Sequence, residues 1–202
     1  MPRPSSRRSR WFAIPLLALA GALLLPATAS AAKETFHRFE VEGTANYTLT
    51  ENCADGSTAQ TRVTVIGGHE EESEEGVTTL DSDFLTVLIR GLDCDFNLIN
   101  DRGSGPAEFT FSSGLERAGV TGTIETDGGR TVTANIAWEG TGGLEITNNV
   151  TTFPGFHGHF QGKERDAVAT GTVVVDGETI VDGSTTNARI ESLEDTNTTT
   201  SE

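Results

Sequence analysis

The chain has 202 residues, with 14 Lys and Arg residues against 30 Asp and Glu, and a formal net charge of −16. This length fits a single domain. A nucleic-acid-binding protein needs a basic surface to neutralise phosphates, so the charge argues against that class. Hydrophobic residues make up 35% of the chain and recur along most of it, which excludes wholesale disorder.

The first 31 residues have the three parts of a secretory signal. Four arginines and no acidic residue lie within residues 1–10, an uncharged apolar run covers 11–25, and Ala29-Ser30-Ala31 follows. The apolar run is shorter than the ~20 residues that a membrane-spanning helix needs. We therefore predict that residues 1–31 are cleaved and that no transmembrane segment remains.

Cleavage makes the protein more acidic. It leaves 10 basic residues against 30 acidic ones, a net charge of −20. Such a surface favours solubility and repels anionic polymers and lipid headgroups, and it could attract cations or basic partners. We expect a secreted protein, extracellular or periplasmic, with a partner at the cell surface or in the medium.

Two cysteines, Cys53 and Cys94, lie in the exported part. An even pair in an oxidising compartment normally forms a disulfide. Two isolated thiols cannot complete a zinc site, and no C-x-x-C spacing is present. We predict a Cys53–Cys94 disulfide.

Apolar and polar residues alternate with period two along the mature chain, which is the signature of β-strands. In chain order the alternation covers residues 37–49, 63–65, 85–89, 94–98, 109–111, 120–124, 132–138, 144–146, 156–160, 167–175 and 188–190. Turn signals such as Asp55-Gly56, Gly67-Gly68, Asp176-Gly177 and Asp182-Gly183 separate many of them. No stretch shows sustained helical periodicity.

These patterns predict an all-β fold, an antiparallel β-sandwich of about nine or ten strands, with a closed β-barrel as the alternative. The single domain should cover residues 32–193, followed by a flexible polar tail at 194–202. Two further segments are expected to be irregular: an acidic loop at 68–75 and a flexible connection at 100–106.

A later stretch resembles a known group of proteins. It contains Ile136-Ala137-Trp138-Glu139-Gly140, then Pro154-Gly155-Phe156, then Gly162-Lys163-Glu164-Arg165-Asp166-Ala167-Val168-Ala169-Thr170-Gly171-Thr172-Val173. Residues 136–173 are in this respect similar to uncharacterised secreted bacterial β-proteins with no assigned activity. The resemblance implies an exported all-β domain and supplies no function.

The most suggestive local motif is Phe156-His157-Gly158-His159-Phe160. On a strand, His157 and His159 share one face and the phenylalanines share the other. Two imidazoles at this spacing suit a transition metal such as zinc, and His37, His69 or Glu164 could complete the site. The alternative is that Phe156 and Phe160 fill the core while both histidines face solvent, and we prefer it.

Acidic residues offer a second metal hypothesis. Asp81 with Asp83, Asp93 with Asp95, and the run Glu70–Glu75 could supply oxygen ligands to calcium. No EF-hand pattern is present, and alternating acids on a strand are usually solvated. We therefore expect no cofactor, with zinc or calcium as the alternative.

No motif of an established enzyme class occurs: there is no G-x-S-x-G, no H-E-x-x-H, no phosphate loop and no dinucleotide fingerprint. The sequence favours an exported, non-enzymatic β-domain with a structural or binding role. The alternative is a secreted metal-binding hydrolase that uses the His-x-His strand.

The signal prediction can be tested on exported protein. Because signal peptidase should cut after Ala31, mass spectrometry should find an N-terminus within about two residues of Ala32. An intact Met1 terminus recovered from the membrane fraction would contradict it.

Overall fold

A computed structural model describes residues 33–200, so the predicted signal and residues 201 and 202 lie outside the described part. The described residues form ten β-strands and no α-helix: β1 (Lys33–Asn52), β2 (Thr58–Glu74), β3 (Val77–Leu92), β4 (Leu98–Pro106), β5 (Glu108–Phe111), β6 (Arg117–Glu125), β7 (Thr131–Gly140), β8 (Glu145–Phe153), β9 (Phe156–Val175) and β10 (Glu178–Thr200). Within this range, no helix is long and apolar enough to cross a membrane.

The strands form one folded antiparallel sheet in the order β4-β3-β2-β1-β10-β9-β7-β6-β5, and β8 pairs with the first half of β9. Strands β4 and β5 are the two ends of this order and do not pair with each other; a single bridge, Gly103 to Thr126, connects β4 with the end of β6. The sheet is therefore not closed. The fold is the predicted antiparallel β-sandwich, and the closed-barrel alternative is wrong.

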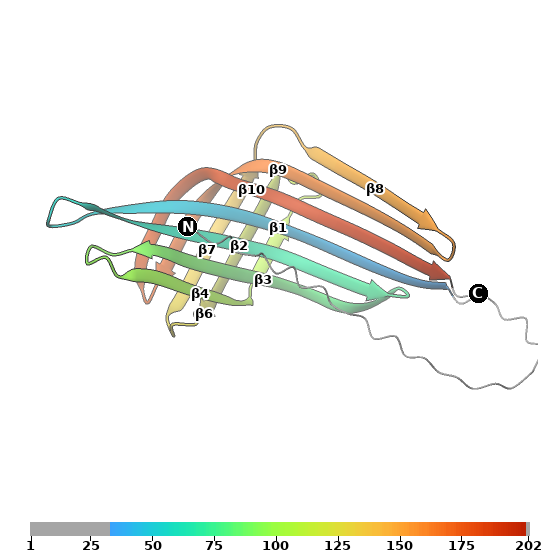
Figure 1. The fold of residues 1–202 in the computed structure, drawn as a ribbon, viewed down its shortest axis with the longest axis horizontal. Helices are drawn as coiled ribbons and strands as arrows, with labels where there is room; N and C mark the ends of the chain where they lie inside the picture. The colour runs from blue at the N-terminus through green and yellow to red at the C-terminus, as the bar shows by residue number, and fades with distance from the viewer. Residues whose placement is uncertain (1–32, 201–202) are drawn as a thin grey trace, which may run out of the picture. The chain divides into compact units, whose positions relative to one another are not determined.

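Two long strands carry the chain from one layer of the sandwich to the other. The second half of β10 pairs with β1, whereas the second half of β9 pairs with β7 (Figure 1). Where they bend, Gly171 of β9 lies directly opposite Gly183 of β10, and β10 has a bulge between Thr185 and Ala188. Glycines and bulges allow this curvature. Strands β1 to β4 thus face β5 to β7 and the adjoining halves of β9 and β10.

Glycines allow the two layers to approach closely in the core. A Cβ atom on Gly43 of β1 would lie 2.7 Å from Cδ2 of Trp138 on β7, and one on Gly67 of β2 would lie 2.5 Å from Cβ of Val120 on β6. Trp138 is only 1% exposed. The sequence predicts a turn at Gly67-Gly68, but the pair lies inside β2. Its glycines serve close packing, because a side chain at Gly67 would clash with Val120.

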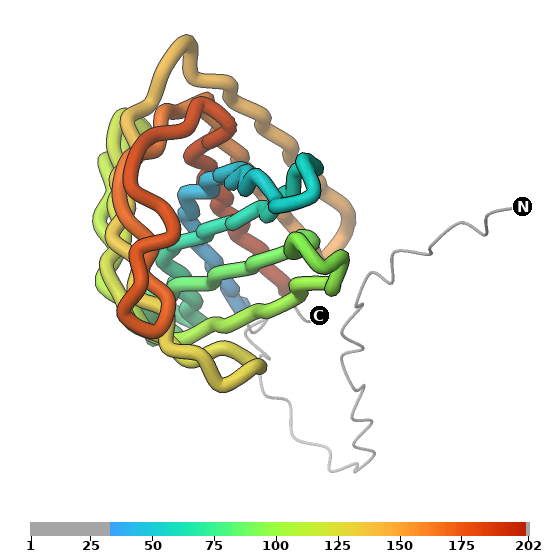
Figure 2. The backbone as a smooth tube through the Cα atoms, turned by 90° about the vertical axis from the view of Figure 1, so that its left-hand side faces the viewer, coloured from blue at the N-terminus to red at the C-terminus, as the bar shows by residue number. Residues whose placement is uncertain are grey.

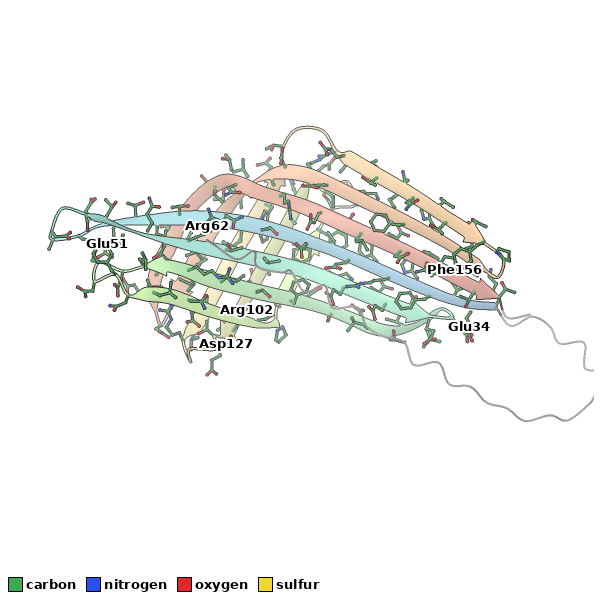
Figure 3. All side chains as sticks on the ribbon, in the orientation of Figure 1. Glu34, Glu51, Arg62, Arg102, Asp127 and Phe156 are labelled. Carbon is green, nitrogen blue, oxygen red and sulfur yellow. A yellow bond between two sulfur atoms is a disulfide. The ribbon has the colours of Figure 1, made fainter. Side chains whose placement is uncertain are left out.

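Several strands continue past the region where the layers face each other. This extension comprises residues 33–40, 69–82, 145–164 and 192–200, among which only Gly158 is buried. Figure 3 shows it at the end marked by Glu34 and Phe156, opposite the end marked by Glu51. Its strands are held by backbone pairing, by cross-strand contacts between polar side chains and by a few aromatic contacts.

Three segments predicted to be irregular are strands, and two of them lie mainly in the extension. Residues 68–74 continue β2, and the turn comes at Glu75-Gly76, where both residues have positive φ. Residues 100–106 lie in β4, paired with β3, and residues 194–200 lie in β10, paired with β1. Backbone pairing outweighs the polar, turn-forming composition in all three, so the expectations of loops and of a flexible tail at 194–200 are wrong.

The close contact between Gly43 and Trp138 can be tested by substitution. Replacing glycine by alanine inside a strand normally stabilises a protein by about 0.5–1 kcal/mol. At Gly43 we expect overpacking against the indole to outweigh this gain, so that Gly43→Ala lowers the free energy of unfolding by about 1–3 kcal/mol. Chemical denaturation measures the change.

Gly143→Ala is the matched control, because a Cβ atom there meets nothing within 4 Å. It should change the free energy of unfolding by less than about 0.5 kcal/mol. Equal effects of the two substitutions would contradict the packing described here.

Candidate functional site

The two layers are open to solvent at the end opposite the extension, and we call this opening the mouth. Figure 2 looks toward this end, with the β1–β2 and β3–β4 hairpins on one side and the β9–β10 hairpin on the other. A cavity of about 360 Å³ lies in the mouth. This volume is at the lower end of the range for small-molecule sites, roughly 300–1,000 Å³.

Side chains from both layers line the cavity. The apolar ones come from β1 to β4 and from β9 and β10, and they are Leu49, Ala59, Ile89, Leu92, Ile99, Val175 and Ile180. Of these, Leu49, Ile99 and Ile180 are partly buried and pack on the main core. The cavity is therefore continuous with the hydrophobic core at one side and open to water at the other.

Below this opening, Tyr47 is the next inward-facing residue of β1 after Leu49, and it is 5% exposed. Its hydroxyl is buried and has no hydrogen-bond partner among the described residues. Burial raises the pKa of Tyr47 to about 12, so the phenol is neutral at physiological pH.

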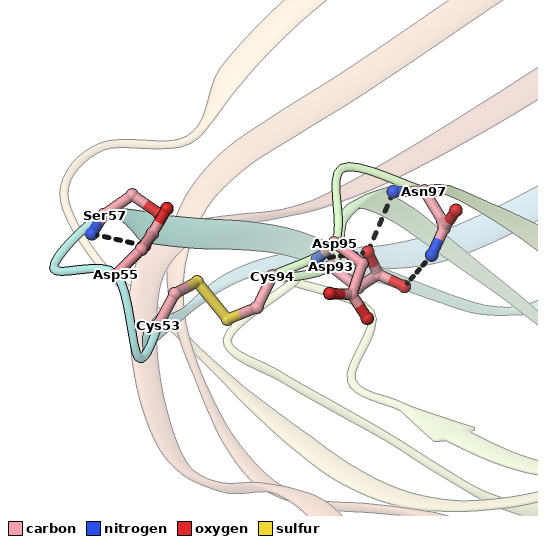
Figure 4. The surroundings of a disulfide bond; sticks show 7 residues. All are labelled: Cys53, Asp55, Ser57, Asp93, Cys94, Asp95 and Asn97. Carbon is pink, nitrogen blue, oxygen red and sulfur yellow. Dashed lines mark hydrogen bonds between the residues drawn. A yellow bond between two sulfur atoms is a disulfide. The ribbon is translucent and has the colours of Figure 1, made fainter.

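The predicted disulfide is present and lies beside the mouth. Cys53 and Cys94 are bonded, with Cα atoms 5.4 Å apart, and they connect the β1–β2 turn to the β3–β4 turn (Figure 4). Hydrogen bonds to aspartates shape both turns: Asp55 accepts from the backbone N–H and hydroxyl of Ser57, and Asp93 accepts from Asp95 and Asn97. The disulfide thereby fixes the two hairpins of one layer relative to each other.

A buried aspartate fixes the other side of the mouth. Asp101 of β4 accepts hydrogen bonds from the Thr126 hydroxyl at 2.8 Å, from the Gly128 backbone at 3.1 Å and from Arg130 Nε at 3.0 Å. Burial by itself would raise the pKa of Asp101. The pKa is nevertheless lowered, because these hydrogen bonds, a further one from the Arg102 backbone N–H and the positive charge of Arg130 all stabilise the carboxylate. This cluster joins the edge of β4 to the β6–β7 turn.

Four carboxylates and one guanidinium surround the cavity. Glu51, Asp93, Asp176 and Glu178 contribute the negative charges, and Arg130 contributes the positive one. Asp176 accepts a hydrogen bond from the Thr131 backbone at 2.9 Å, which holds it at the β9–β10 turn. The mouth therefore combines apolar walls with an acidic rim.

The four histidines of the chain lie on one face of the sheet but do not converge. His37 is opposite Thr196, which is opposite His159, and the alternation along β9 places His157 on the same face. His37 Nε2 lies 3.3 Å from Glu194, His157 Nδ1 lies 3.0 Å from the Thr152 hydroxyl, and His69 Nδ1 lies 2.8 Å from Asp83. Each of these three rings thus has a partner of its own.

Glu164, the fourth residue of the predicted metal set, lies on the opposite face of β9. It is directly opposite Glu191, and its carboxylate is 3.8 Å from Arg189. Among residues 33–200, no group of three or more His, Cys, Asp or Glu side chains is arranged to hold a metal ion. The structure does not bring His37, His157, His159 and Glu164 together.

The prediction that Phe156 and Phe160 fill the core is wrong, whereas His157 is exposed as expected and His159 is partly buried. In β9, the buried Ala167 and Ala169 share their face with the histidines, so Phe156 and Phe160 lie on the other face. Both phenylalanines are only partly buried, because this half of β9 belongs to the extension. Phe156 stacks on Phe153 of β8, with ring centroids 4.6 Å apart.

That outer face carries a row of glutamates. Glu42, Glu191, Glu164 and Glu145 are directly opposite one another across β1, β10, β9 and β8. Together with Glu40 they line a hollow of about 480 Å³, where Gly162 leaves space beside Phe160 and Leu193. Like charges directly opposite each other destabilise a sheet. Arg189 lies 3.2 Å from Glu191 and offsets part of the repulsion.

Two glutamates at this hollow, Glu42 of the row and its neighbour Glu40, have raised pKa values, and burial is the main cause of both shifts. The pKa of Glu42 is raised to about 7, mainly by burial. A hydrogen bond with the Glu191 carboxyl and the negative charge of Glu191 raise it further. Burial also raises the pKa of Glu40, although Arg38 beside it acts in the opposite direction. Protonation of Glu42 therefore relieves repulsion between β1 and β10.

Comparisons with known proteins give no family. No family model and no curated protein matches the chain. A solved structure from Nitrosomonas europaea, provisionally assigned as AttH, is aligned over 90% of this chain and 57% of that protein, with 11% identity and a TM-score of 0.21. This chain spans less than two thirds of that protein, and a likeness at this score carries no argument about function.

The glutamate row predicts that stability falls as the pH rises. Glu42 has a folded-state pKa of about 7, above the ordinary 4.5, so its contribution is present below pH 4.5 and is lost as pH rises through 7. The parent should lose on the order of 2 kcal/mol of its free energy of unfolding between pH 5 and pH 8 through this group. Glu42→Gln should not show this loss.

Denaturation at both pH values measures this difference, and Glu125→Gln is the matched control on an exposed position of β6. The lowered pKa values of Asp55, Asp93 and Asp101 affect stability only at lower pH, so they leave this window unchanged. An identical pH profile for Glu42→Gln and the parent would contradict the role of the row.

Proposed function

We propose that the mature chain is an exported, non-enzymatic domain that binds a small apolar molecule in the mouth of its sandwich. The cavity in the mouth carries this proposal, because it combines apolar walls from six strands with a few polar groups at its opening. Such an arrangement is typical of a small-molecule site. The secretory signal and the acidic composition support export into an aqueous medium.

Two features support a site that keeps its shape without ligand. The Cys53–Cys94 disulfide joins the hairpins on one side, and the Asp101–Arg130 contact joins β4 to the β6–β7 turn. A preorganised cavity binds more tightly, since less conformational entropy is lost on binding. The hydrolase alternative needs converging ligands or a catalytic pair, and no observation on the described residues favours it.

A cavity-filling substitution tests the proposal. A neutral fluorescent probe, N-phenyl-1-naphthylamine, should bind to the parent. Ala59→Phe should weaken this binding at least about tenfold, because the new ring takes up volume in the cavity and each tenfold loss corresponds to about 1.4 kcal/mol. Ala137→Phe, the same change on an exposed position of β7, should leave binding unchanged.

A second variant guards against misfolding of Ala59→Phe. Leu49→Asn removes apolar wall without adding volume and should also weaken probe binding, with circular dichroism confirming the fold. If the probe does not bind to the parent, or if both folded variants bind it as tightly as the parent does, the proposal is wrong.

A further inference from the structure

We propose that the ligand of the mouth is a cationic amphiphile: a short apolar chain that enters the cavity, with an ammonium group held at the rim. This inference rests on the proposed function and adds the chemical class of the ligand. Three observations carry it: the charge balance of the rim, the placement of its carboxylates, and the size of the cavity.

The rim has an excess of negative charge that its own arginine does not neutralise. Arg130 is the one cationic residue lining the cavity, and its Nε is 3.0 Å from Asp101, outside the lining. Asp101 is 12% exposed and fully engaged with the β6–β7 turn, so Arg130 serves mainly to balance it. No ion pair within residues 33–200 involves the rim residues Glu51 or Glu178.

The carboxylates surround the opening from both layers. Glu51 and Asp93 belong to the layer of β1 to β4, whereas Asp176 and Glu178 belong to the β9–β10 hairpin. Hydrogen bonds from Asn97 in its own turn hold Asp93, and a hydrogen bond from the Thr131 backbone of β7 holds Asp176, so both carboxylates are kept at the opening. An ammonium group between the two sides would be attracted by both, and an anionic headgroup would be repelled by both.

The volume limits the apolar part. About 360 Å³ accommodates one short chain and not the two chains of a membrane lipid. The mature chain as a whole, with 10 basic residues against 30 acidic ones, also attracts cations and disfavours the approach of fatty acids. The chemistry of the mouth therefore matches an alkylamine or a quaternary alkylammonium compound.

Calorimetric titration with four probes tests the class of ligand: octyltrimethylammonium, octanol, octyl sulfate and tetramethylammonium, at concentrations where none self-associates. We expect octyltrimethylammonium to bind at least tenfold more tightly than octanol, and neither octyl sulfate nor tetramethylammonium to bind measurably. Added salt should weaken octyltrimethylammonium binding and leave octanol binding nearly unchanged.

A pair of double variants places the charge effect at the rim. Glu51→Gln with Glu178→Gln should reduce octyltrimethylammonium binding nearly to the level of octanol binding measured on the same variant. Glu125→Gln with Glu139→Gln, which removes the same charge from exposed positions of β6 and β7, should have little effect on either probe.

The outcomes separate the two proposals. If none of the three octyl compounds binds, the proposed function itself fails. If octanol binds and octyl sulfate matches or exceeds octyltrimethylammonium, the site stands and the cationic class is wrong. Tetramethylammonium and octyltrimethylammonium could also bind equally tightly, or the two double variants could have equal effects. Either result would show general attraction of cations by an acidic protein and would overturn the inference.

Discussion

The close packing of Trp138 on Gly43 sets the distance between the two layers, and the rest of the sandwich depends on it. Because Gly43 has no side chain, the indole lies directly on the β1 backbone, and Gly67 receives Val120 in the same way. These contacts use small residues in one layer and large residues in the other, which fills the centre of the core. At the mouth, apolar side chains from both layers leave a cavity that is open to water.

The open end keeps its form through covalent and electrostatic contacts. The disulfide connects the turns after β1 and β3, and Asp101 connects β4 to the β6–β7 turn through three hydrogen-bonded partners. At the opposite end, the extension has no disulfide and touches the other layer where Phe39 and His69 meet Phe111. The glutamate row runs from Glu145 and Glu164 in the extension to Glu191 and Glu42 beside it. The molecule thus has one end fixed by covalent and electrostatic contacts, and a glutamate row whose effect on stability depends on the protonation of Glu42.

Much of the fold follows from period-two patterns, and its errors have two causes. The inward faces of residues 41–47, 85–89 and 132–138 carry the apolar residues of the period-two alternation, so the pattern agrees with the structure there. The pattern fails at 68–75 and 194–200, because backbone pairing continues there with almost no buried face to select apolar residues. For the same reason Phe156 and Phe160 indicate the wrong face. The pattern fails at 100–106 because the inward positions Gly103 and Gly105 lie against Ile124 of β6, where a close approach of the backbone leaves no room for an apolar side chain. The mouth gave no sequence signal: residues such as Leu49 and Ile180, far apart in the chain, look like ordinary core positions until the fold places them beside Glu51 and Glu178.

We propose that ligand binding takes place between the layers at the disulfide end and not along the glutamate row. Amide chemical shifts of isotope-labelled mature protein, titrated with octyltrimethylammonium, test this most directly. We expect the largest shifts at residues of the mouth, including Leu49, Ile89 and Ile180, and little change at Glu42 and Glu191. Shifts concentrated on the glutamate row, or spread evenly over the acidic surface, would contradict it.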